Sequence, residues 1–290
     1  MDAVTLDFAA WPAPAKLNLM LRIVGRRADG YHLLQTVFQF LDCCDWLWFE
    51  PRTDGAITRD GEIFDVPPEA DLTVRAARLL QQATGTGRGA LIRIDKHLPM
   101  GGGLGGGSSD AATTLVALNH YWQTGLTLAE LAELGLRLGA DVPVFVHGRA
   151  AWAEGVGERL TPLDLDEPWF VVLTPSCHVA TGAVFGDPEL TRDSPLITIA
   201  DFLMGAGGND CAAVVYRRHP EVAAAAAWLA RHGQGRLTGT GACVFAAFPD
   251  PDSAGRVLDQ LPPGWTGFAA RGRNRSPLHE RLSREHVAFA

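Results

Sequence analysis

Six glycines lie within seven residues in the stretch HLPMGGGLGGGSSDAA, positions 97–112. Glycine loses more backbone freedom on folding than any other residue, so this run indicates that bare backbone is needed there. Residues 90–95 alternate like a strand, and Ser108, Ser109 and Asp110 are typical of the start of a helix. Glycines next to the unpaired N–H groups of a helix start form an anion site. The run predicts phosphate binding, and a plain linker fits less well between strand and helix signals.

Known phosphate-binding loops differ from this run. Gly101, Gly103 and Gly106 satisfy the dinucleotide pattern G-x-G-x-x-G, but a glycine run matches it by chance, and the loop begins about a hundred residues into the chain. A Walker A loop has a lysine after its last glycine, where this chain has Ser108. The H-R-D and D-F-G motifs of protein kinases do not follow. The residues alone therefore leave the type of phosphate site open.

Composition limits the class of protein. The chain has 290 residues, of which 47% are hydrophobic and 20% charged, so it is long enough for two domains with real cores. Its net charge of -8 argues against nucleic-acid binding, although a local basic pocket stays open. The five cysteines form no C-x-x-C pair, which favours free thiols over zinc or disulfides. With no visible signal peptide and no apolar run long enough for a bilayer, we expect a cytoplasmic protein without membrane contact.

Strands and helices alternate along the chain. Strands are predicted at 15–24, 34–41, 45–50, 90–95, 169–174 and 242–248, with a turn at Asp29–Gly30. Helices are predicted between the caps Asp71 and Gly85, from Ser108, after the capping box Thr127–Glu130, and as a pair over about 210–231. A helix and a last strand follow. A change of charge and Pro/Gly pattern near residue 160 predicts two domains, 1–160 and 161–290.

Four ordered motifs together carry a resemblance to a known family. They are PAKLNLMLRIVGRRADGYH at 14–32, LPMGGGLGGGSSDAA at 98–112, LGADVPVFVHGRAAWAEGVGE at 138–158 and LTGTGACVFA at 237–246. The chain resembles the GHMP kinase superfamily from Pro14 to SPLH at 276–279, nearly its whole length. The resemblance implies a two-domain α+β fold with the active site in the interdomain cleft. The N-terminal domain binds ATP and is similar to ribosomal protein S5 domain 2, and the C-terminal domain is ferredoxin-like.

Within the superfamily, the motifs are similar to those of kinases that phosphorylate the 2-hydroxyl of CDP-methylerythritol. This resemblance implies ATP as phosphoryl donor and two small-molecule substrates, in a monomer or homodimer. Mg²⁺ is expected because kinases use it to neutralise phosphate oxygens, but the metal ligands stay unassigned. Another small-molecule GHMP kinase, such as a mevalonate or homoserine kinase, stays open, although RADGYH and the paired aromatics argue against it. A non-catalytic nucleotide-binding protein is the other alternative, and intact Lys16 and Asp141 argue against that.

Two charged residues are the candidate catalytic pair. By its local sequence alone, Asp141 is also typical of a helix cap or a turn before Pro143, and Lys16 of a solvated strand face. The resemblance makes Asp141 the base that deprotonates or orients the attacking hydroxyl. It places Lys16 beside this carboxylate, where a cation keeps the carboxylate ionised and in position. Asn18, on the same strand face as Lys16, is implied to hydrogen-bond the substrate.

The resemblance also implies the residues that recognise the substrate. Tyr31 stacks on the cytosine, His32 hydrogen-bonds its edge, and Phe185 closes the sandwich from the other domain. By position alone, the first two are equally typical of a cavity rim and Phe185 of a core. Thr240 and Gly241, in a second glycine-rich turn TGTGA, are placed beside the substrate phosphates. A simple helix-to-strand connection is the alternative for that turn.

The residues implied to bind ATP are those of the glycine run and its flanks. They are Lys96, Pro99, Met100, Gly101, Gly102, Gly103, Leu104, Gly105, Gly106, Gly107, Ser108 and Ser109. Met100 stands where relatives often carry a small or hydroxyl residue, which we do not expect to change the chemistry.

Overall fold

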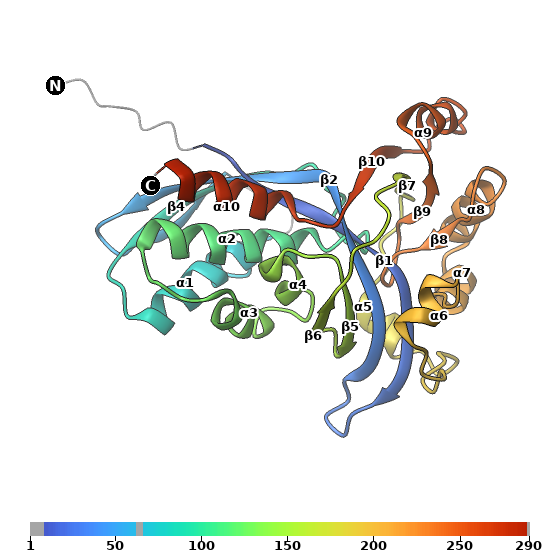
Figure 1. Ribbon diagram of the computed structural model, residues 1–290, viewed down its shortest axis with the longest axis horizontal. Coiled ribbons are helices and arrows are strands. Elements are labelled where there is room, and N and C mark those ends of the chain that lie inside the picture. The colour runs from blue at the N-terminus through green and yellow to red at the C-terminus, as the bar shows by residue number, and fades with distance from the viewer. Residues whose placement is uncertain (1–8, 62–65, 289–290) are drawn as a thin grey trace.

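One mixed sheet organises the computed structural model, which describes residues 9–61 and 66–288 (Figure 1). The strands are β1 (Trp11–Arg26), β2 (His32–Arg52), β3 (Ile57–Asp60), β4 (Gly89–Asp95), β5 (Ala151–Gly155), β6 (Arg159–Pro162), β7 (Trp169–Leu173), β8 (Arg236–Leu237), β9 (Val244–Phe248) and β10 (Gly267–Arg273). Their main order is β3-β4-β2-β10-β7-β9-β8. β2 is the centre of the sheet, because it pairs antiparallel with β1, β4, β5 and β10.

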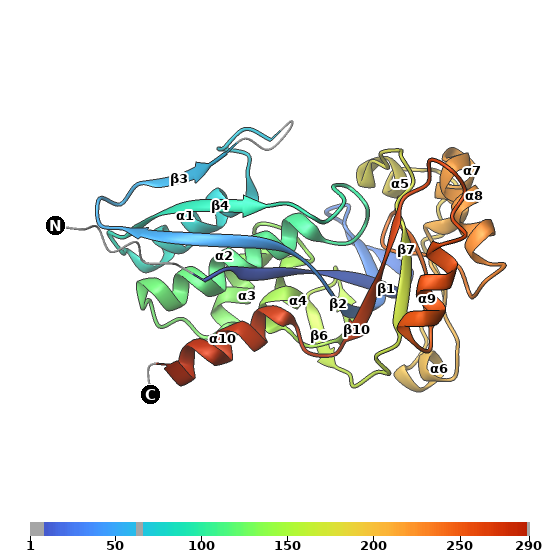
Figure 2. The same cartoon turned by 90° about the horizontal axis from the view of Figure 1, so that it is seen from above.

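The helices lie in two groups at opposite ends of β1 and β2 (Figure 2). They are α1 (Leu72–Thr84), α2 (Gly106–Trp122), α3 (Leu128–Leu136), α4 (Val142–His147), α5 (Thr181–Phe185), α6 (Ile199–Leu203), α7 (Ala212–Arg218), α8 (Pro220–Leu229), α9 (Pro251–Leu258) and α10 (Pro277–Ala288). In Figure 2, α1 to α4 and α10 surround one end of the two long strands, and α7 to α9 cover β7 and β9 at the other.

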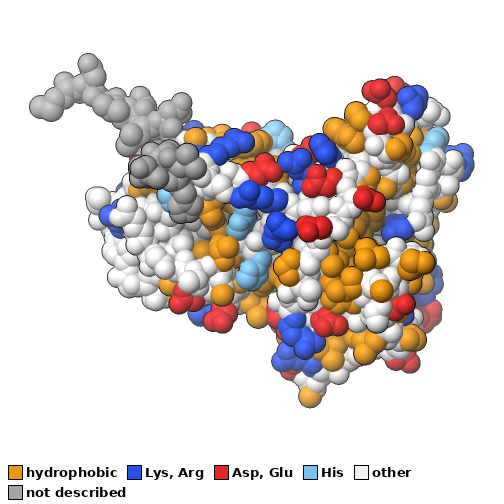
Figure 3. All heavy atoms as spheres, in the orientation of Figure 1, with side chains coloured by type: hydrophobic (Ala, Val, Ile, Leu, Met, Phe, Trp, Pro, Cys, Tyr) orange, Lys and Arg blue, Asp and Glu red, His pale blue; other side chains and the backbone are white. Residues whose placement is uncertain are grey.

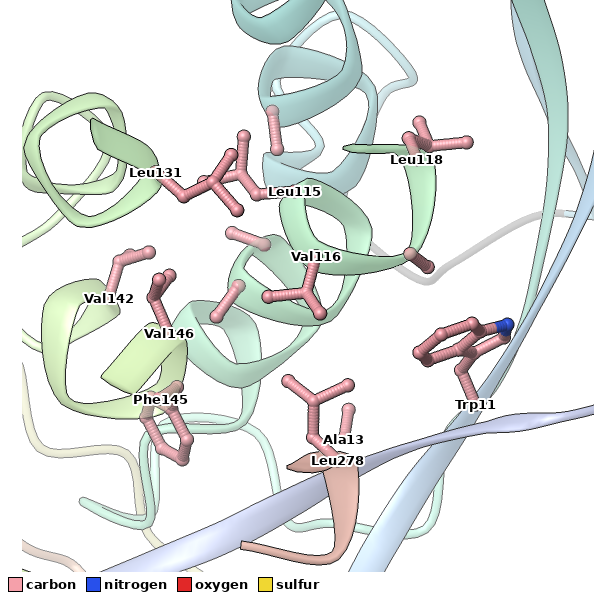
Figure 4. Close-up of a cluster of buried hydrophobic side chains, with 14 of the residues drawn as sticks. Trp11, Ala13, Leu115, Val116, Leu118, Leu131, Val142, Phe145, Val146 and Leu278 are labelled. Carbon is pink, nitrogen blue, oxygen red and sulfur yellow. The ribbon is translucent and has the colours of Figure 1, made fainter. Parts of the chain in front are cut away.

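Two main clusters of buried side chains correspond to these groups. The first surrounds α2 and includes Trp11, Leu115 and Phe145 (Figure 4). The second fills the space between β7, β9 and helices α7 to α9, with Val171 and Leu229 fully buried in it. The α+β class expected from the sequence is thus present.

The last helix belongs to the first group, although the chain reaches it from the second. α10 follows the second cluster in sequence but packs on β1 and α2, and its Leu278 is fully buried in the first cluster. The division into domains 1–160 and 161–290 stays a prediction.

Several elements match the sequence signals. Asp71 caps α1 by accepting a hydrogen bond from the Thr73 N–H, and Gly85 ends this helix at a φ of 66°. The capping box predicted at Thr127 is present at the start of α3. The two helices predicted over 210–231 are α7 and α8.

Two predicted boundaries are wrong. The strands predicted at 34–41 and 45–50 are one strand, β2. Its pairing with β1 shifts register between the pairs Lys16–Phe40 and Pro14–Cys44 and then continues, so the strand is not interrupted. α2 begins at Gly106, two residues before the predicted start, with Gly105 as its N-cap. The strands β3, β5, β6 and β8 and the helices α4, α5, α6 and α10 were not predicted.

All five cysteines carry free thiols, as their spacing predicts. Within residues 9–61 and 66–288, no helix combines the length and the apolar character needed to cross a membrane.

Candidate active site

A cavity of about 1030 Å³ lies between the β1–β2 hairpin, the glycine loop (residues 101–107), the start of α4, and α5. The residues predicted from the sequence that line it are Lys16, Asn18, Tyr31, His32, Lys96, Pro99, Met100, Gly101, Gly102, Gly103, Leu104, Gly105, Gly106, Gly107, Ser108, Asp141, Phe185 and Thr240. Ser109 and Gly241 do not line it. Ser109 is fully buried in α2, and a Cβ atom at Gly241 would lie 3.1 Å from Leu237 in the second cluster.

Lys16 and Asp141, which are 125 positions apart in sequence, form an ion pair in this cavity. Lys16 Nζ lies 3.1 Å from Asp141 Oδ2, and the lysine is 2% exposed whereas the aspartate side chain is 36% exposed. The ammonium also donates to Asn18 Oδ1 at 2.5 Å and to the Gly103 carbonyl at 3.3 Å. A buried charge with this set of acceptors is held in a defined position. Lys16 is therefore not the solvated surface lysine that its local sequence also allowed.

Asp141 does not act as the helix cap that its position suggests. It is the N-cap residue of α4, but its side chain accepts no capping hydrogen bond, and its carboxylate pairs with Lys16 instead. A carboxylate that is partly exposed to a cavity and fixed by one cation is suited to accept a proton from a bound hydroxyl.

Asn18 has a structural role besides the predicted one. Its Oδ1 accepts from Lys16, and its Nδ2 donates to Thr36 Oγ1 at 2.9 Å. Because these two bonds fix the orientation of the amide, Asn18 holds the lysine in place through a second acceptor besides Asp141.

The glycine loop is packed closely against the protein itself. Gly103 has a φ of 78°, and a Cβ atom there would lie 2.4 Å from the Thr238 carbonyl oxygen. At Gly105, with a φ of 75°, a Cβ atom would lie 2.9 Å from the Phe145 ring. Part of the glycine content is therefore explained by close contact with neighbouring backbone and side-chain atoms of the protein and not by a ligand.

The end of the loop is more open. A Cβ atom at Gly106 would have its nearest contact at 3.5 Å, and one at Gly107 at 3.3 Å. Both glycines are in the first turn of α2, which has 17 residues and no side-chain cap at its N-terminus. Such a helix start carries N–H groups and a partial positive charge suited to an anion. The predicted phosphate site thus has its free backbone at Gly106 and Gly107.

The second glycine-rich turn fixes the loop to β1. Thr238 Oγ1 accepts from the Asn18 N–H at 3.0 Å and donates to the Gly103 carbonyl at 3.3 Å. Thr240, which lines the cavity, forms a hydrogen bond of 2.9 Å with Thr181 at the start of α5. The turn is therefore more than a helix-to-strand connection, because it joins three segments of the site.

Lys96 lies between two buried carboxylates. Its Nζ contacts Asp45, which also accepts from the backbone N–H groups of His97 and Leu98, and contacts Asp110 Oδ2 at 2.7 Å. Burial raises the pKa of Asp110 to about 7, although Lys96 opposes this shift. Burial also opposes the charge on Lys96, but the two carboxylates outweigh it and raise the pKa of the lysine.

Two oxygens at the start of α2 have no hydrogen-bond partner among the residues that the structure describes. They are Ser109 Oγ and Asp110 Oδ1, both fully enclosed. Asp110 lines the cavity beside Ser108, whereas Ser109 does not. A buried unpaired carboxylate oxygen is costly, so its presence at the predicted phosphate site points to a ligand there.

The far end of the cavity is formed by aromatic side chains. Tyr31, at the tip of the β1–β2 hairpin, is 63% exposed. The His32 imidazole stacks on the Phe185 ring, with centroids 5.0 Å apart and the planes inclined by 21°. Burial and the charges of Arg192 and Arg26 lower the pKa of His32. Figure 3 shows Lys and Arg side chains gathered over this protruding hairpin.

Sequence reasoning missed four residues of this arrangement: Asp45, Asp110, Thr238 and Arg192. Asp110 follows the two serines directly, and a carboxylate this close to the glycine run was a visible signal. Asp45, Thr238 and Arg192 act through partners more than 50 positions away, and their local sequence contains no sign of this.

The comparisons with known proteins define the class. Two protein-family models, described as GHMP kinases N terminal domain and GHMP kinases C terminal, match residues 71–149 and 195–264. The chain belongs to the GHMP kinase family, whose members use ATP as phosphoryl donor.

Individual proteins that are similar to this chain share a more specific name than the family does. The chain is 58% identical over 94% of its length to 4-diphosphocytidyl-2-C-methyl-D-erythritol kinase of Nitrosococcus oceani, covering 98% of that protein. It is 60% identical to the kinase of the same name of Chromohalobacter salexigens, with 93% of each chain covered. A crystal structure of 4-(cytidine 5'-diphospho)-2C-methyl-D-erythritol kinase has a TM-score of 0.79 and 33% identity, with 91% of this chain and 99% of that chain covered. A mevalonate kinase structure at 15% identity and a TM-score of 0.67 shows the shared fold alone.

Proposed function

We propose that the chain is a 4-diphosphocytidyl-2-C-methyl-D-erythritol kinase. It transfers the γ-phosphoryl group of ATP to the 2-hydroxyl of that substrate, a step of the non-mevalonate route to isoprenoid precursors. High identity over nearly the full length supports this function. The observation that carries it is the pair of Lys16 and Asp141, held in the cavity beside a glycine loop.

The Lys16–Asp141 pair performs the proton transfer and orients the reacting groups. Asp141 accepts or orients the proton of the attacking hydroxyl. Lys16 keeps Asp141 ionised and, because it also contacts the Gly103 carbonyl, lies between the carboxylate and the loop. Phosphoryl transfer depends mainly on such positioning and on neutralisation of charge.

The N-terminus of α2 binds the triphosphate. Gly106 and Gly107 let phosphate oxygens approach the backbone, and the helix dipole favours their negative charge. The close packing of Gly103 and Gly105 keeps the loop in the shape that presents these N–H groups.

The donor set at this helix start fits Mg²⁺. This ion prefers oxygen ligands and takes one or two protein groups together with substrate phosphates. Asp110, whose Oδ1 has no hydrogen-bond partner among the described residues, and Ser108 both line the cavity at the start of α2, and their side-chain oxygens would hold it. When bound, the ion would neutralise charge on the transferred phosphoryl group. Lys96 would hold the second oxygen of Asp110.

The aromatic end binds the cytidine. Tyr31 and Phe185 stack on the base and His32 hydrogen-bonds its edge. Thr240 lies close enough to the same part of the cavity to contact the substrate phosphates.

The experiment that tests this function compares acceptors. The protein is incubated with ATP and Mg²⁺ and, separately, with 4-diphosphocytidyl-2-C-methyl-D-erythritol, mevalonate or homoserine. We expect ADP formation only with the first, and formation slower by at least about a hundredfold with the Asp141→Asn variant. Turnover of mevalonate or homoserine instead, or of none of the three, contradicts the proposal. The two-domain boundary, the oligomeric state and a cytoplasmic location stay predictions.

A further inference from the structure

Arg192 is bound to the aromatic end of the cavity by four hydrogen bonds. It lies between α5 and α6. Its Nη1 donates to the Leu190 carbonyl at 3.0 Å, and its Nη2 donates to the carbonyls of Phe185 at 3.0 Å and Asp187 at 2.7 Å. Its Nε donates to His32 Nε2 at 3.2 Å. The same guanidinium therefore contacts the backbone of one aromatic residue of the site and the ring of another.

The bond to His32 determines the state of the imidazole. A guanidinium has only donors, so the nitrogen facing it must carry a lone pair. With Nε2 as acceptor, the neutral ring carries its proton on Nδ1. Protonation would place an N–H group against the guanidinium, and burial with the charges of Arg192 and Arg26 disfavours it as well.

Within the described part of the chain, no carboxylate forms an ion pair with Arg192 that would neutralise its positive charge beside His32. Asp187, whose carbonyl binds Arg192, directs its carboxylate to Arg217 and Arg218 instead. Arg192 itself forms no ion pair there, and its acceptors are carbonyls and the imidazole. Its full charge thus acts on the His32 ring.

The other side of the ring is available to a ligand. His32 lines the cavity, and its position is fixed by stacking on Phe185. Since Nε2 is used by Arg192, Nδ1–H is the polar group of the imidazole that is left for the substrate.

We propose that Arg192 is a specificity-determining positioning residue, which holds His32 as the Nδ1–H tautomer and so makes the site select cytosine over uracil. The proposal rests on the proposed function, because it assumes that the base binds beside His32. At position 3, cytosine has a lone pair and uracil an N–H group. An Nδ1–H donor therefore fits cytosine and opposes uracil, whereas the other tautomer would present a lone pair and favour the reverse.

The first measurement concerns the protein without substrate. Imidazole ¹⁵N shifts of His32 are compared in the wild type, Arg192→Met and Arg22→Gln. Arg22 is the matched control, because its guanidinium also binds a carbonyl of the same segment, that of Pro195, but does not contact His32. We expect a pure Nδ1–H tautomer in the wild type and the control. Arg192→Met should give a mixture, with a raised pKa. An unchanged tautomer in Arg192→Met overturns the proposal.

The second measurement concerns discrimination between bases. Dissociation constants for CDP and UDP are measured by titration calorimetry. We expect the wild type to favour CDP, and Arg192→Met to reduce this preference, the ratio of the UDP to the CDP dissociation constant, by about fivefold to tenfold, the effect of one hydrogen bond. In a His32→Ala background, Arg192→Met should leave the ratio unchanged, which a merely structural role would not produce. If the methionine variant does not fold, Arg192→Lys is the test: it keeps the charge and N–H donors that can face His32 Nε2, so it should keep the CDP preference, and loss of that preference overturns the proposal.

The outcomes separate this proposal from the proposed function. A wild type that phosphorylates 4-diphosphocytidyl-2-C-methyl-D-erythritol but binds CDP and UDP equally overturns the role of Arg192 and leaves the function intact. A wild type inactive with that substrate contradicts the function itself. An Arg192→Met variant that keeps the wild-type ratio overturns the specificity role even if the tautomer changes.

Discussion

The two ends of the cavity are built in different ways. At the phosphate end, β1, the glycine loop, the 238–242 turn and α4 meet through backbone contacts and buried charges. At the aromatic end, side chains on a hairpin tip and on a short helix face an open space, and Tyr31 is mostly exposed. The difference indicates that the reacting groups are fixed before substrate arrives, whereas base recognition depends on a few side chains. Substitutions at the first end should therefore affect chemistry or folding, and those at the second affect affinity.

The largest effect should come from the catalytic pair. Asp141→Asn keeps the shape of the side chain but cannot accept a proton, so kcat should fall by about 10²–10⁴-fold with little change in KM. Lys16→Met should also be severe, and the double variant should lose less than the sum of the two in free energy, because the groups act as a unit. Steady-state kinetics of the three variants measure this.

A matched control is Asp164→Asn, since Asp164 is exposed, pairs with Arg149 and does not line the cavity. It should have wild-type kinetics. If Asp141→Asn retains more than about a tenth of the activity, the loss in kcat is well below the expected range of about 10²–10⁴-fold. Asp141 is then not the base.

Substitution of two glycines of the same loop should change two different properties, ATP affinity at Gly106 and stability at Gly103. Gly106→Ala should leave the free energy of unfolding nearly unchanged, since its Cβ atom has space, but weaken ATP binding by about tenfold or more, roughly 1.4 kcal/mol. Gly103→Ala should lower the free energy of unfolding by more than about 1 kcal/mol, because of its positive φ and the Thr238 carbonyl. Denaturant unfolding and ATP titration separate the two effects. Normal ATP affinity in a folded Gly106→Ala protein would exclude close approach of phosphate there.

At the aromatic end, affinity should change without loss of ATP binding. Tyr31→Ala should weaken the cytidine-bearing substrate by the equivalent of roughly 1–3 kcal/mol, the usual value of one base stack, and leave stability unchanged because the ring is exposed. Phe185→Ala should have the same effect on affinity and also reduce stability, since this ring packs against the second cluster. Calorimetric titration of each substrate decides the matter. An equal loss for both substrates would indicate misfolding instead.

The smallest effect concerns protonation. His32 should titrate below its ordinary pKa of 6.5, because burial and then Arg192 and Arg26 disfavour its charged form. Its neutral form is therefore kept as pH falls through 6.5 and is lost only below that value. Arg26→Gln should raise this pKa by less than Arg192→Met, which follows from the order of the two charges. An NMR titration of His32 that gives the reverse order would contradict the geometry at this end.

The sequence predicted the residues of the candidate site better than it predicted where the strands and helices begin and end. The glycine loop, Lys16 and Asp141 were found because their motifs are local and ordered, and the structure brings them together. Ser109 and Gly241 belong to the same motifs but face the protein interior, which a motif does not reveal. Asp45, Thr238 and Arg192 were missed because each acts on a distant segment. β2 was wrongly predicted as two strands, because the alternation of apolar and polar residues breaks between 41 and 45 while the strand continues beside β1 after a register shift.

The packing of α10 affects the order in which the chain is completed. β1 is synthesised first and α10 last, yet Leu278 is buried in the first cluster and Arg281 lies 5.0 Å from the ring of Trp11. A chain still on the ribosome has β1, β2 and α2 available long before the helix that covers them. The apolar surface of the N-terminal half therefore stays partly open during synthesis, and the two ends of the chain become stable together.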